Sequence, residues 1–281
     1  MSTSTTSTTS TTGTDADREL KSRHRTMWAL GDYPAVADEV IPELGRVLVD
    51  ATGIAPGDRV LDVAAGNGNA AVPAARAGAE VVASDLTPAL LEVGRATVGD
   101  QLPITWQEGD AEALPYEEAS FDAVISCVGV MFAPHHQAAA DEILRVTRPE
   151  GRIGLVSWTP EGFIGQMFAT MKPYAPAPPP GAQPPPLWGS EDHVRELFGD
   201  RVTEVSTTRH RLHVDRFASA ADFREFFKTR YGPTIAVYRA NAEDPERCAA
   251  LDRDLDALAE RFGAASGAME WEYLLVTARR R

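Results

Sequence analysis

Residues 58–71 read DRVLDVAAGNGNAA, and the rest of the chain is organised around this stretch. The segment VLDV at 60–63 has the mostly apolar character of a buried parallel strand. It ends in a turn of small residues at 64–68, and an alanine-rich helical stretch follows at 70–77. A strand, a tight turn and a helix in this order predict the first half of a βαβ nucleotide-binding unit, because small residues let the backbone approach a ligand closely.

The spacing within the turn indicates which nucleotide is bound. A dinucleotide fold usually carries Gly-x-Gly-x-x-Gly, whereas this chain has Asp62-x-Ala-x-Gly-x-Gly without the third glycine. The pattern resembles the first motif of the class I S-adenosylmethionine-dependent methyltransferases, with Ala64 where that family usually has glycine. The resemblance implies that Asp62 lies near the ammonium group of the cofactor and that Ala64, Gly66 and Asn69 contact the cofactor. The alternative is a buried turn that binds no ligand.

The second strand of the predicted core ends in an acidic residue. Residues 81–85 predict a strand that ends on Asp85, at the distance after Gly68 where an open α/β sheet places an acid against a ribose. A carboxylate at this point can accept hydrogen bonds from both ribose hydroxyls, which predicts a cofactor contact for Asp85. The alternative role of this side chain is a helix cap.

A second acidic residue follows the third predicted strand, in the string GDAEALP at 109–115. This string resembles the adenine-side motif of the quinone-biosynthesis-like branch (type 11) of the same methyltransferases. The resemblance implies that Asp110 accepts a hydrogen bond from the adenine amine, that the Ala111 N–H lies beside it and that Leu86 covers the ring. We interpret Glu112 as a solvated loop charge.

The fourth strand is expected to bring further cofactor contacts. Residues 120–132 predict a strand and a loop at its carboxyl end, where open α/β sheets bind ligands. The backbone carbonyls of Ser126 and Cys127 are expected to hold the amino group of the cofactor. Met131 is expected to line the route to its methyl group.

Candidate lid and acid–base residues are few. The N-terminal helices of such families fold over cofactor and substrate, which makes Trp28 a candidate cofactor contact and Tyr33 a candidate lid residue; ordinary core aromatics are the alternative. A general base is needed only if the acceptor atom must lose a proton, and the catalytic candidates are Tyr33, His135, His136 and Tyr231. Two adjacent histidines cannot easily chelate one metal ion, and no carboxylate lies at ligand spacing beside them, so no metal site is expected.

Composition restricts the partners. The chain has 281 residues and a formal net charge of −14, which argues against nucleic acid, because phosphate-backbone binding depends on Lys and Arg. Its two cysteines are too few for a disulfide framework or a zinc site, which favours a reducing cytoplasm. No apolar run approaches the roughly 18 residues needed to span a membrane. A small-molecule substrate and a monomer or homodimer are expected.

The chain divides into four segments in this interpretation. Residues 1–14 are a disordered Ser/Thr tail, 15–50 an N-terminal helical lid, 51–160 the cofactor-binding α/β core and 161–281 the remainder of the sheet with an inserted substrate cap at about 161–200 and 216–265. The predicted fold is α/β: a Rossmann-like, seven-stranded, mostly parallel sheet whose last strand is antiparallel, with helices on both faces and a helical cap.

The predicted function is methyl transfer from S-adenosylmethionine to a small molecule by in-line displacement, with an aromatic secondary metabolite as one candidate acceptor. Two alternatives stay open. An NAD(P)-dependent Rossmann oxidoreductase shares the opening unit, but the missing third glycine and the lack of a Tyr-x-x-x-Lys pair disfavour it. A non-catalytic S-adenosylmethionine-binding protein is the other alternative.

Overall fold

The computed structural model describes residues 11–281, so most of the predicted Ser/Thr tail lies outside the described residues. The prediction that a disordered tail extends to Thr14 was wrong, because the first helix, α1, begins at Thr11. Once a helix is nucleated, each further residue adds a hydrogen bond at little cost, so a helix readily extends into a neighbouring polar stretch.

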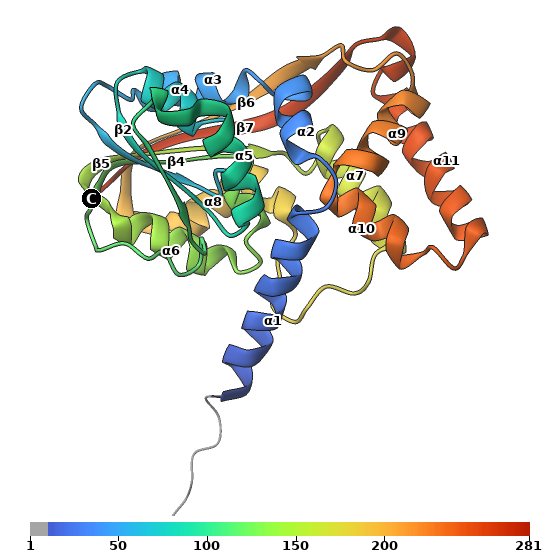
Figure 1. The fold of residues 1–281 in the computed structure, drawn as a ribbon, viewed down its shortest axis with the longest axis horizontal. Helices are drawn as coiled ribbons and strands as arrows, with labels where there is room; N and C mark the ends of the chain where they lie inside the picture. The colour runs from blue at the N-terminus through green and yellow to red at the C-terminus, as the bar shows by residue number, and fades with distance from the viewer. Residues whose placement is uncertain (1–10) are drawn as a thin grey trace, which may run out of the picture.

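Up to β5 the fold alternates strands and helices, except that no helix separates β3 from β4; further helices, β6 and β7 follow (Figure 1). The helices are α1 (Thr11–Trp28), α2 (Tyr33–Val40), α3 (Leu44–Thr52), α4 (Ala71–Arg76), α5 (Pro88–Val98), α6 (His136–Val146), α7 (Phe163–Met171), α8 (Glu191–Phe198), α9 (Ala220–Arg230), α10 (Gly232–Ala240) and α11 (Pro245–Arg261). The strands are β1 (Arg59–Val63), β2 (Glu80–Asp85), β3 (Ile104–Glu108), β4 (Phe121–Cys127), β5 (Thr147–Trp158), β6 (Val202–Val214) and β7 (Met269–Arg280). Two short 3-10 helices matter below, η2 (Val130–Phe132) and η4 (Pro185–Gly189).

The prediction of a seven-stranded, mostly parallel sheet is confirmed. The strand order is β3-β2-β1-β4-β5-β7-β6; neighbours from β3 to β5 are parallel, and β7 is antiparallel to both β5 and β6. The order reverses at β1, which has β2 on one side and β4 on the other. Ligands of open α/β sheets bind at the carboxyl ends of the strands at such a switch point, so the turn after β1 lies where a ligand is expected.

Helices cover both faces of the sheet, as predicted. Figure 1 shows α3 and α4 above the sheet and α6 and α8 below it. The central strands are therefore apolar on both faces, and Val60, Leu61 and Phe121 are fully buried. Among residues 11–281, no helix is both long enough and apolar enough to cross a membrane.

The cap is built mainly from the C-terminal helices. α7, α9, α10 and α11 gather at one end of the sheet (Figure 1), where α11 packs against α7 and α9. α8 falls within the predicted cap segment 161–200 but packs against α6 below the sheet, because its apolar residues Val194, Leu197 and Phe198 are buried on that side.

The N-terminal helices join the cap along a line of contacts that we term the lid–cap seam. Gly31, between α1 and α2, forms an isolated bridge with Tyr231, between α9 and α10. The backbone N–H of Asp32 donates to the carbonyl oxygen of Arg230 at 3.0 Å. Glu39 of α2 also pairs with Arg230, at 2.9 Å. The segment between α1 and α2 is therefore held directly against the segment between α9 and α10.

Candidate active site

A cavity lies at the carboxyl ends of the central strands, with about 660 Å³ of empty space that includes open solvent at its mouth. Its walls come from α1, from the first residue of α2, from the turns after β1 and β2, from the segment Gly109–Ala111 and from residues 128–134 around η2. The sequence prediction concerned these same turns, so each predicted site residue can be placed relative to this cavity.

The turn after β1 has an unusual backbone. Ala64, Gly66 and Gly68 have φ values of 55°, 57° and 95°. Glycine adopts such angles at little cost, whereas an L-residue such as alanine loses about 1–2 kcal/mol in the left-handed region. Packing imposes the path: a Cβ atom added to Gly129 would lie only 2.3 Å from the carbonyl oxygen of Ala64, so the loop after β4 presses directly on the turn. Ala64 and Gly66 both line the cavity, and strained backbone of this kind is concentrated at functional sites.

Asp62 is a buried carboxylate that is not fully satisfied. It is 1% exposed, and no hydrogen bond of normal geometry reaches either of its side-chain oxygens from the residues that the structure describes. Burial raises the pKa of Asp62 to about 8, and the nearby backbone N–H of Ala71 offsets only part of this rise. Because an unpartnered buried carboxylate is costly, a cationic or hydrogen-bonding group delivered next to it would be strongly favoured. The side chain lies behind the turn and does not itself line the cavity.

Asp85 lines the cavity and ties the turn to the second helix. One carboxylate oxygen accepts from the backbone N–H of Gly66 at 2.9 Å, and the other accepts from the N–H of Thr87 at 2.7 Å, just before α5. Burial raises its pKa. The bond to Thr87 closes a turn directly before α5 and does not cap the helix, because Thr87 is itself the N-cap residue; the ribose contact stays a prediction. Leu86, predicted to cover the adenine ring, also lines the cavity.

The adenine-side segment contains a cation that the sequence prediction missed. Asp110 and Ala111 line the cavity, and the Nζ atom of Lys21, on α1, lies 2.9 Å from the Oδ1 atom of Asp110 and also contacts Glu112. Our interpretation of Glu112 as a solvated charge was wrong, because its side chain is only 7% exposed and accepts from Lys21 and from His135.

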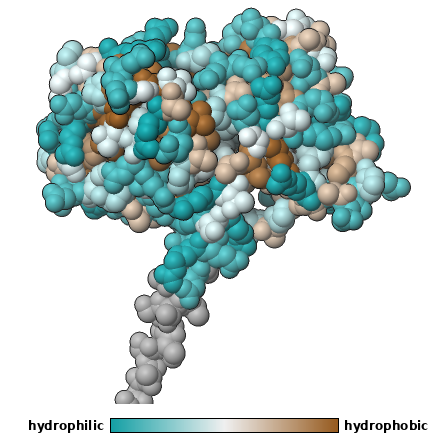
Figure 2. Space-filling model, viewed as in Figure 1, coloured by the Kyte–Doolittle hydropathy of each residue, from teal (hydrophilic) through white to brown (hydrophobic). Residues whose placement is uncertain are grey.

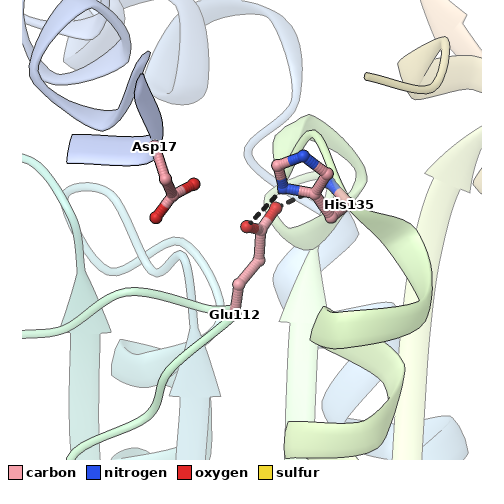
Figure 3. Close-up of side chains that lie close together, drawn as sticks. All are labelled: Asp17, Glu112 and His135. Carbon is pink, nitrogen blue, oxygen red and sulfur yellow. Dashed lines mark hydrogen bonds and ion pairs between the residues drawn. The ribbon is translucent and has the colours of Figure 1, made fainter. Parts of the chain in front are cut away.

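Figure 3 shows that Glu112 also brings His135 close to Asp17 of α1. One ligand atom from each of these three side chains lies within 4.8 Å of the others, so the expectation that no carboxylate accompanies the histidine pair was wrong. The Nδ1 atom of His135 lies 2.9 Å from Glu112. The ammonium of Lys21 already contacts the same carboxylate, and a second cation there would be repelled. We therefore assign this cluster to Lys21 and not to a metal ion.

Aromatic residues form the wall opposite the turn. Trp28, Tyr33 and Phe132 line the cavity, with ring centroids 5.5 Å apart for Trp28–Tyr33 and 4.7 Å apart for Trp28–Phe132. Tyr231 does not line the cavity; it is buried behind Trp28 and Tyr33, with centroid distances of 5.8 Å and 6.5 Å. Burial, together with the nearby carboxylates and the Cys127 thiol, raises the pKa of Tyr33 well above its usual value.

The catalytic candidate His136 lies away from the cavity. It is fully buried beside Trp188 of η4, and its Nδ1 atom lies 2.9 Å from the Nε2 atom of His193 on α8. Its own Nε2 has no partner within residues 11–281. Burial and then the neighbouring histidines lower its pKa to about 3, so it is a neutral packing residue in this position.

The remaining predicted contacts lie just outside the cavity lining. The Oγ atom of Ser126 donates to the carbonyl of Val63 at 2.7 Å and accepts from the backbone N–H of Val130 at 2.9 Å, so it braces two strand ends. Cys127 and Met131 are buried, and the Nδ2 atom of Asn69 contacts the Cys127 sulfur at 3.7 Å. The chain reverses at residue 128, where φ is +46°, so residues 128–130 face the cavity instead.

Comparison with known proteins identifies the class. Residues 61–155 match the methyltransferase domain family, over the segment that holds the turn, Asp85 and Asp110. The match covers about a third of the chain, and together with the strand order of the sheet it shows the class I methyltransferase fold.

Individual relatives extend the comparison. The chain is 51% identical over 266 residues to the uncharacterized protein Rv1405c of Mycobacterium tuberculosis, covering 94% of this chain and 97% of that protein. It is 45% identical over 108 residues to the demethylmenaquinone methyltransferase of Renibacterium salmoninarum, covering 38% of this chain and 44% of that protein. The crystal structure of a putative methyltransferase from Bacillus halodurans has a TM-score of 0.56 at 19% identity and covers 84% of this chain and 97% of that chain, which bears on the fold alone.

Proposed function

We propose that the protein transfers the methyl group of S-adenosylmethionine to a small-molecule acceptor. The observation that carries this proposal is Asp62, a buried carboxylate of raised pKa that receives no hydrogen bond of normal geometry and lies near the end of β1, just before a turn of left-handed backbone. Such a carboxylate fits the ammonium group of an amino-acid tail, whereas a pyrophosphate in the same turn would add negative charge beside it.

The other walls of the cavity fit the rest of that cofactor. Asp85 and Asp110 offer carboxylates along one side, and Leu86 offers an apolar surface between them. We assign the ribose hydroxyls to Asp85 and the adenine amine to Asp110, with the Ala111 N–H beside it. The nicotinamide alternative would instead need donors for two phosphates near the turn.

The chemistry requires little from the protein beyond alignment. The bound cofactor supplies an electrophilic sulfonium methyl group, so the chain has to hold the acceptor atom in line with it and exclude water, and proximity of this kind accounts for many powers of ten in rate. Trp28, Tyr33 and Phe132 are placed to do this, because they cover the cavity opposite the turn.

Tyr33 serves as a hydrogen-bond donor in this proposal. Of the catalytic candidates Tyr33, His136 and Tyr231, it alone lines the cavity. Its raised pKa keeps the hydroxyl protonated at neutral pH, so it can orient an acceptor oxygen or nitrogen but cannot remove a proton. The proton of an acceptor hydroxyl or amine then leaves to solvent as the methyl group is transferred.

We propose an uncharged aromatic acceptor, such as a secondary metabolite. Lys21 pairs with Asp110, Asp85 accepts from two backbone N–H groups, and we assign the remaining oxygen of Asp110 to the cofactor, so none of these side chains that line the cavity is left over for a charged acceptor. The aromatic wall offers offset or edge-to-face contacts to a flat ring instead.

Titration calorimetry tests the cofactor assignment. The purified chain is titrated with S-adenosylmethionine, S-adenosylhomocysteine and NADH in parallel, and we expect micromolar binding of the first two and none of the third. Binding of NADH alone would contradict the methyltransferase assignment and favour the oxidoreductase alternative. A second experiment distinguishes an enzyme from a non-catalytic binding protein. The chain is incubated with S-adenosylmethionine and a library of aromatic acceptors, and mass spectrometry detects a gain of one methyl group. The variant Tyr33→Phe serves as the control for acceptor orientation.

A further inference from the structure

One face of α1 forms the edge of the cavity on its adenine side. Lys21, His24 and Trp28 all line the cavity, and their spacing along the helix places them on one face with Asp17. Figure 2 shows that most of the visible surface of α1 is hydrophilic, and Figure 1 shows the helix leaning away from the body of the protein. On its inner side, Leu20 is buried and the ring of Trp28 packs against Phe132, and polar side chains add to these apolar contacts.

Lys21 is the most buried of these polar attachments. The residue is 8% exposed although it carries a charge, and its Nζ atom contacts both Asp110 and Glu112 of the segment after β3. Arg25, one turn further along α1, pairs with Glu108, but both of those side chains are close to half exposed. Exposed ion pairs contribute little, whereas a desolvated lysine between two carboxylates makes strong charge-assisted hydrogen bonds.

The contacts of Lys21 leave one oxygen of Asp110 available. The Oδ1 atom accepts from the Nζ atom of Lys21 and from the backbone N–H of Glu112, both at 2.9 Å. Both of these bonds end on Oδ1, no hydrogen bond from the described residues reaches the Oδ2 atom, and the side chain lines the cavity. Two donors on one oxygen fix the plane of the carboxylate, so the other oxygen is held in one orientation as an acceptor for an amine.

We propose that Lys21 is a positioning residue that orients Asp110 to recognise the 6-amino group of the purine, and so couples the seating of α1 to the identity of the base. This inference rests on the proposed function, because it assigns the adenine amine to Asp110. Without Lys21, two carboxylates two residues apart in the sequence would face each other without their cation, and their repulsion would turn Asp110 away from the cavity.

The chemistry of the purine base makes the effect of Lys21 on base recognition testable. A 6-amino group donates a hydrogen bond to a carboxylate, whereas the 6-oxo group of the deaminated nucleoside presents an oxygen that the carboxylate repels. A site built to bind a donor rejects the analogue that lacks it, because its own polar group is then left unpaired. Discrimination between the two bases therefore reports on the orientation of Asp110 and not merely on the presence of α1.

The experiment compares S-adenosylhomocysteine with S-inosylhomocysteine by titration calorimetry on the full-length chain. For the wild-type protein we expect about 30- to 100-fold tighter binding of the adenosyl compound. Lys21→Met, which keeps the length of the side chain but removes its charge, is expected to weaken adenosyl binding about tenfold or more and to reduce the preference to about threefold or less. Lys21→Arg should restore most of the preference.

Arg25→Met is the matched control, since it removes a cation from the same helix and should change both affinities by less than about twofold. The inference is overturned if Lys21→Met keeps the wild-type preference, or if it weakens both compounds equally, because a purely structural role of α1 would have that second effect. If the wild-type chain binds neither compound, the proposed function itself fails, and the inference fails with it.

Discussion

Replacing Asp62 by asparagine should change how the stability of the protein depends on pH. The folded chain holds this carboxyl with a pKa near 8, whereas the unfolded chain exposes it with an ordinary pKa of 3.8. Between these values the folded state binds a proton that the unfolded state does not bind. The free energy of unfolding therefore falls as pH rises, by at most about 1.4 kcal/mol per pH unit. Between pH 5.5 and pH 7.5 the loss due to Asp62 reaches at most about 3 kcal/mol.

Asp62→Asn removes this loss because an amide does not titrate in that range. Urea unfolding followed by circular dichroism at pH 5.5 and pH 7.5 measures this loss. The quantity compared is the change in the free energy of unfolding between the two pH values, because the substitution also changes the absolute stability through the buried amide. Asp50→Asn, at an exposed carboxylate with 65% of its side chain accessible, is the control and should follow the wild type. Parallel pH dependence in the wild type and in Asp62→Asn would refute the assignment of a raised pKa to this residue.

Three further substitutions test other parts of the site. His136→Gln should reduce the loss of stability below pH 6.5. In the wild type, this histidine binds a proton below pH 6.5 only in the unfolded chain, because its pKa in the folded chain is near 3, so the free energy of unfolding falls by up to about 1.4 kcal/mol for each pH unit. Urea unfolding at pH 5 and pH 7 checks this. Gly129→Ala should reduce the free energy of unfolding by about 1–3 kcal/mol or more and so lower the thermal midpoint, because the added Cβ would lie 2.3 Å from the Ala64 carbonyl oxygen. An unchanged midpoint in calorimetry would contradict this packing. Ala64→Gly should stabilise the folded state by up to about 1 kcal/mol and so raise the thermal midpoint slightly, because the strain of a left-handed alanine is removed while the conformational entropy of the unfolded chain increases. A clear decrease of the midpoint would mean that the turn is not strained.

The local features of the site were predictable from the sequence because their signals are local. Small residues directly after an apolar strand indicate the turn after β1; Asp85 ends β2, and Asp110 follows the end of β3 by two residues. Parallel strands that end at one edge bring such residues together, whatever the details of the helices between them. The sequence predicted a mostly parallel sheet of seven strands with the last one antiparallel, as the structure has it, but not the order of the strands.

The residues that the prediction missed depend on contacts between distant segments. Lys21 reaches Asp110 from a helix 89 positions away in the sequence, and only the one-sided spacing of polar residues on α1 could have indicated it. His136 is buried by η4 and α8, which are formed by a later segment of the chain and cannot be inferred from the residues around the histidine pair. The shift from Ser126 and Cys127 to residues 128–130 results from a single left-handed residue, Val128, which no propensity predicts.

The lid–cap seam has a consequence for the timing of the reaction. The chain turns at Gly31, and directly after this residue it is held by the carbonyl oxygen of Arg230 and by the bridge to Tyr231. If α1 moves by rotating at this point, it must either break those backbone contacts or carry the end of α9 with it. Trp28 and Tyr33, which flank Gly31 and line the cavity, would then move together with Tyr231, which packs behind them. In the proposed reaction, exchange of the spent cofactor and release of the methylated product would share this one conformational step, and anything that slows the step would slow both.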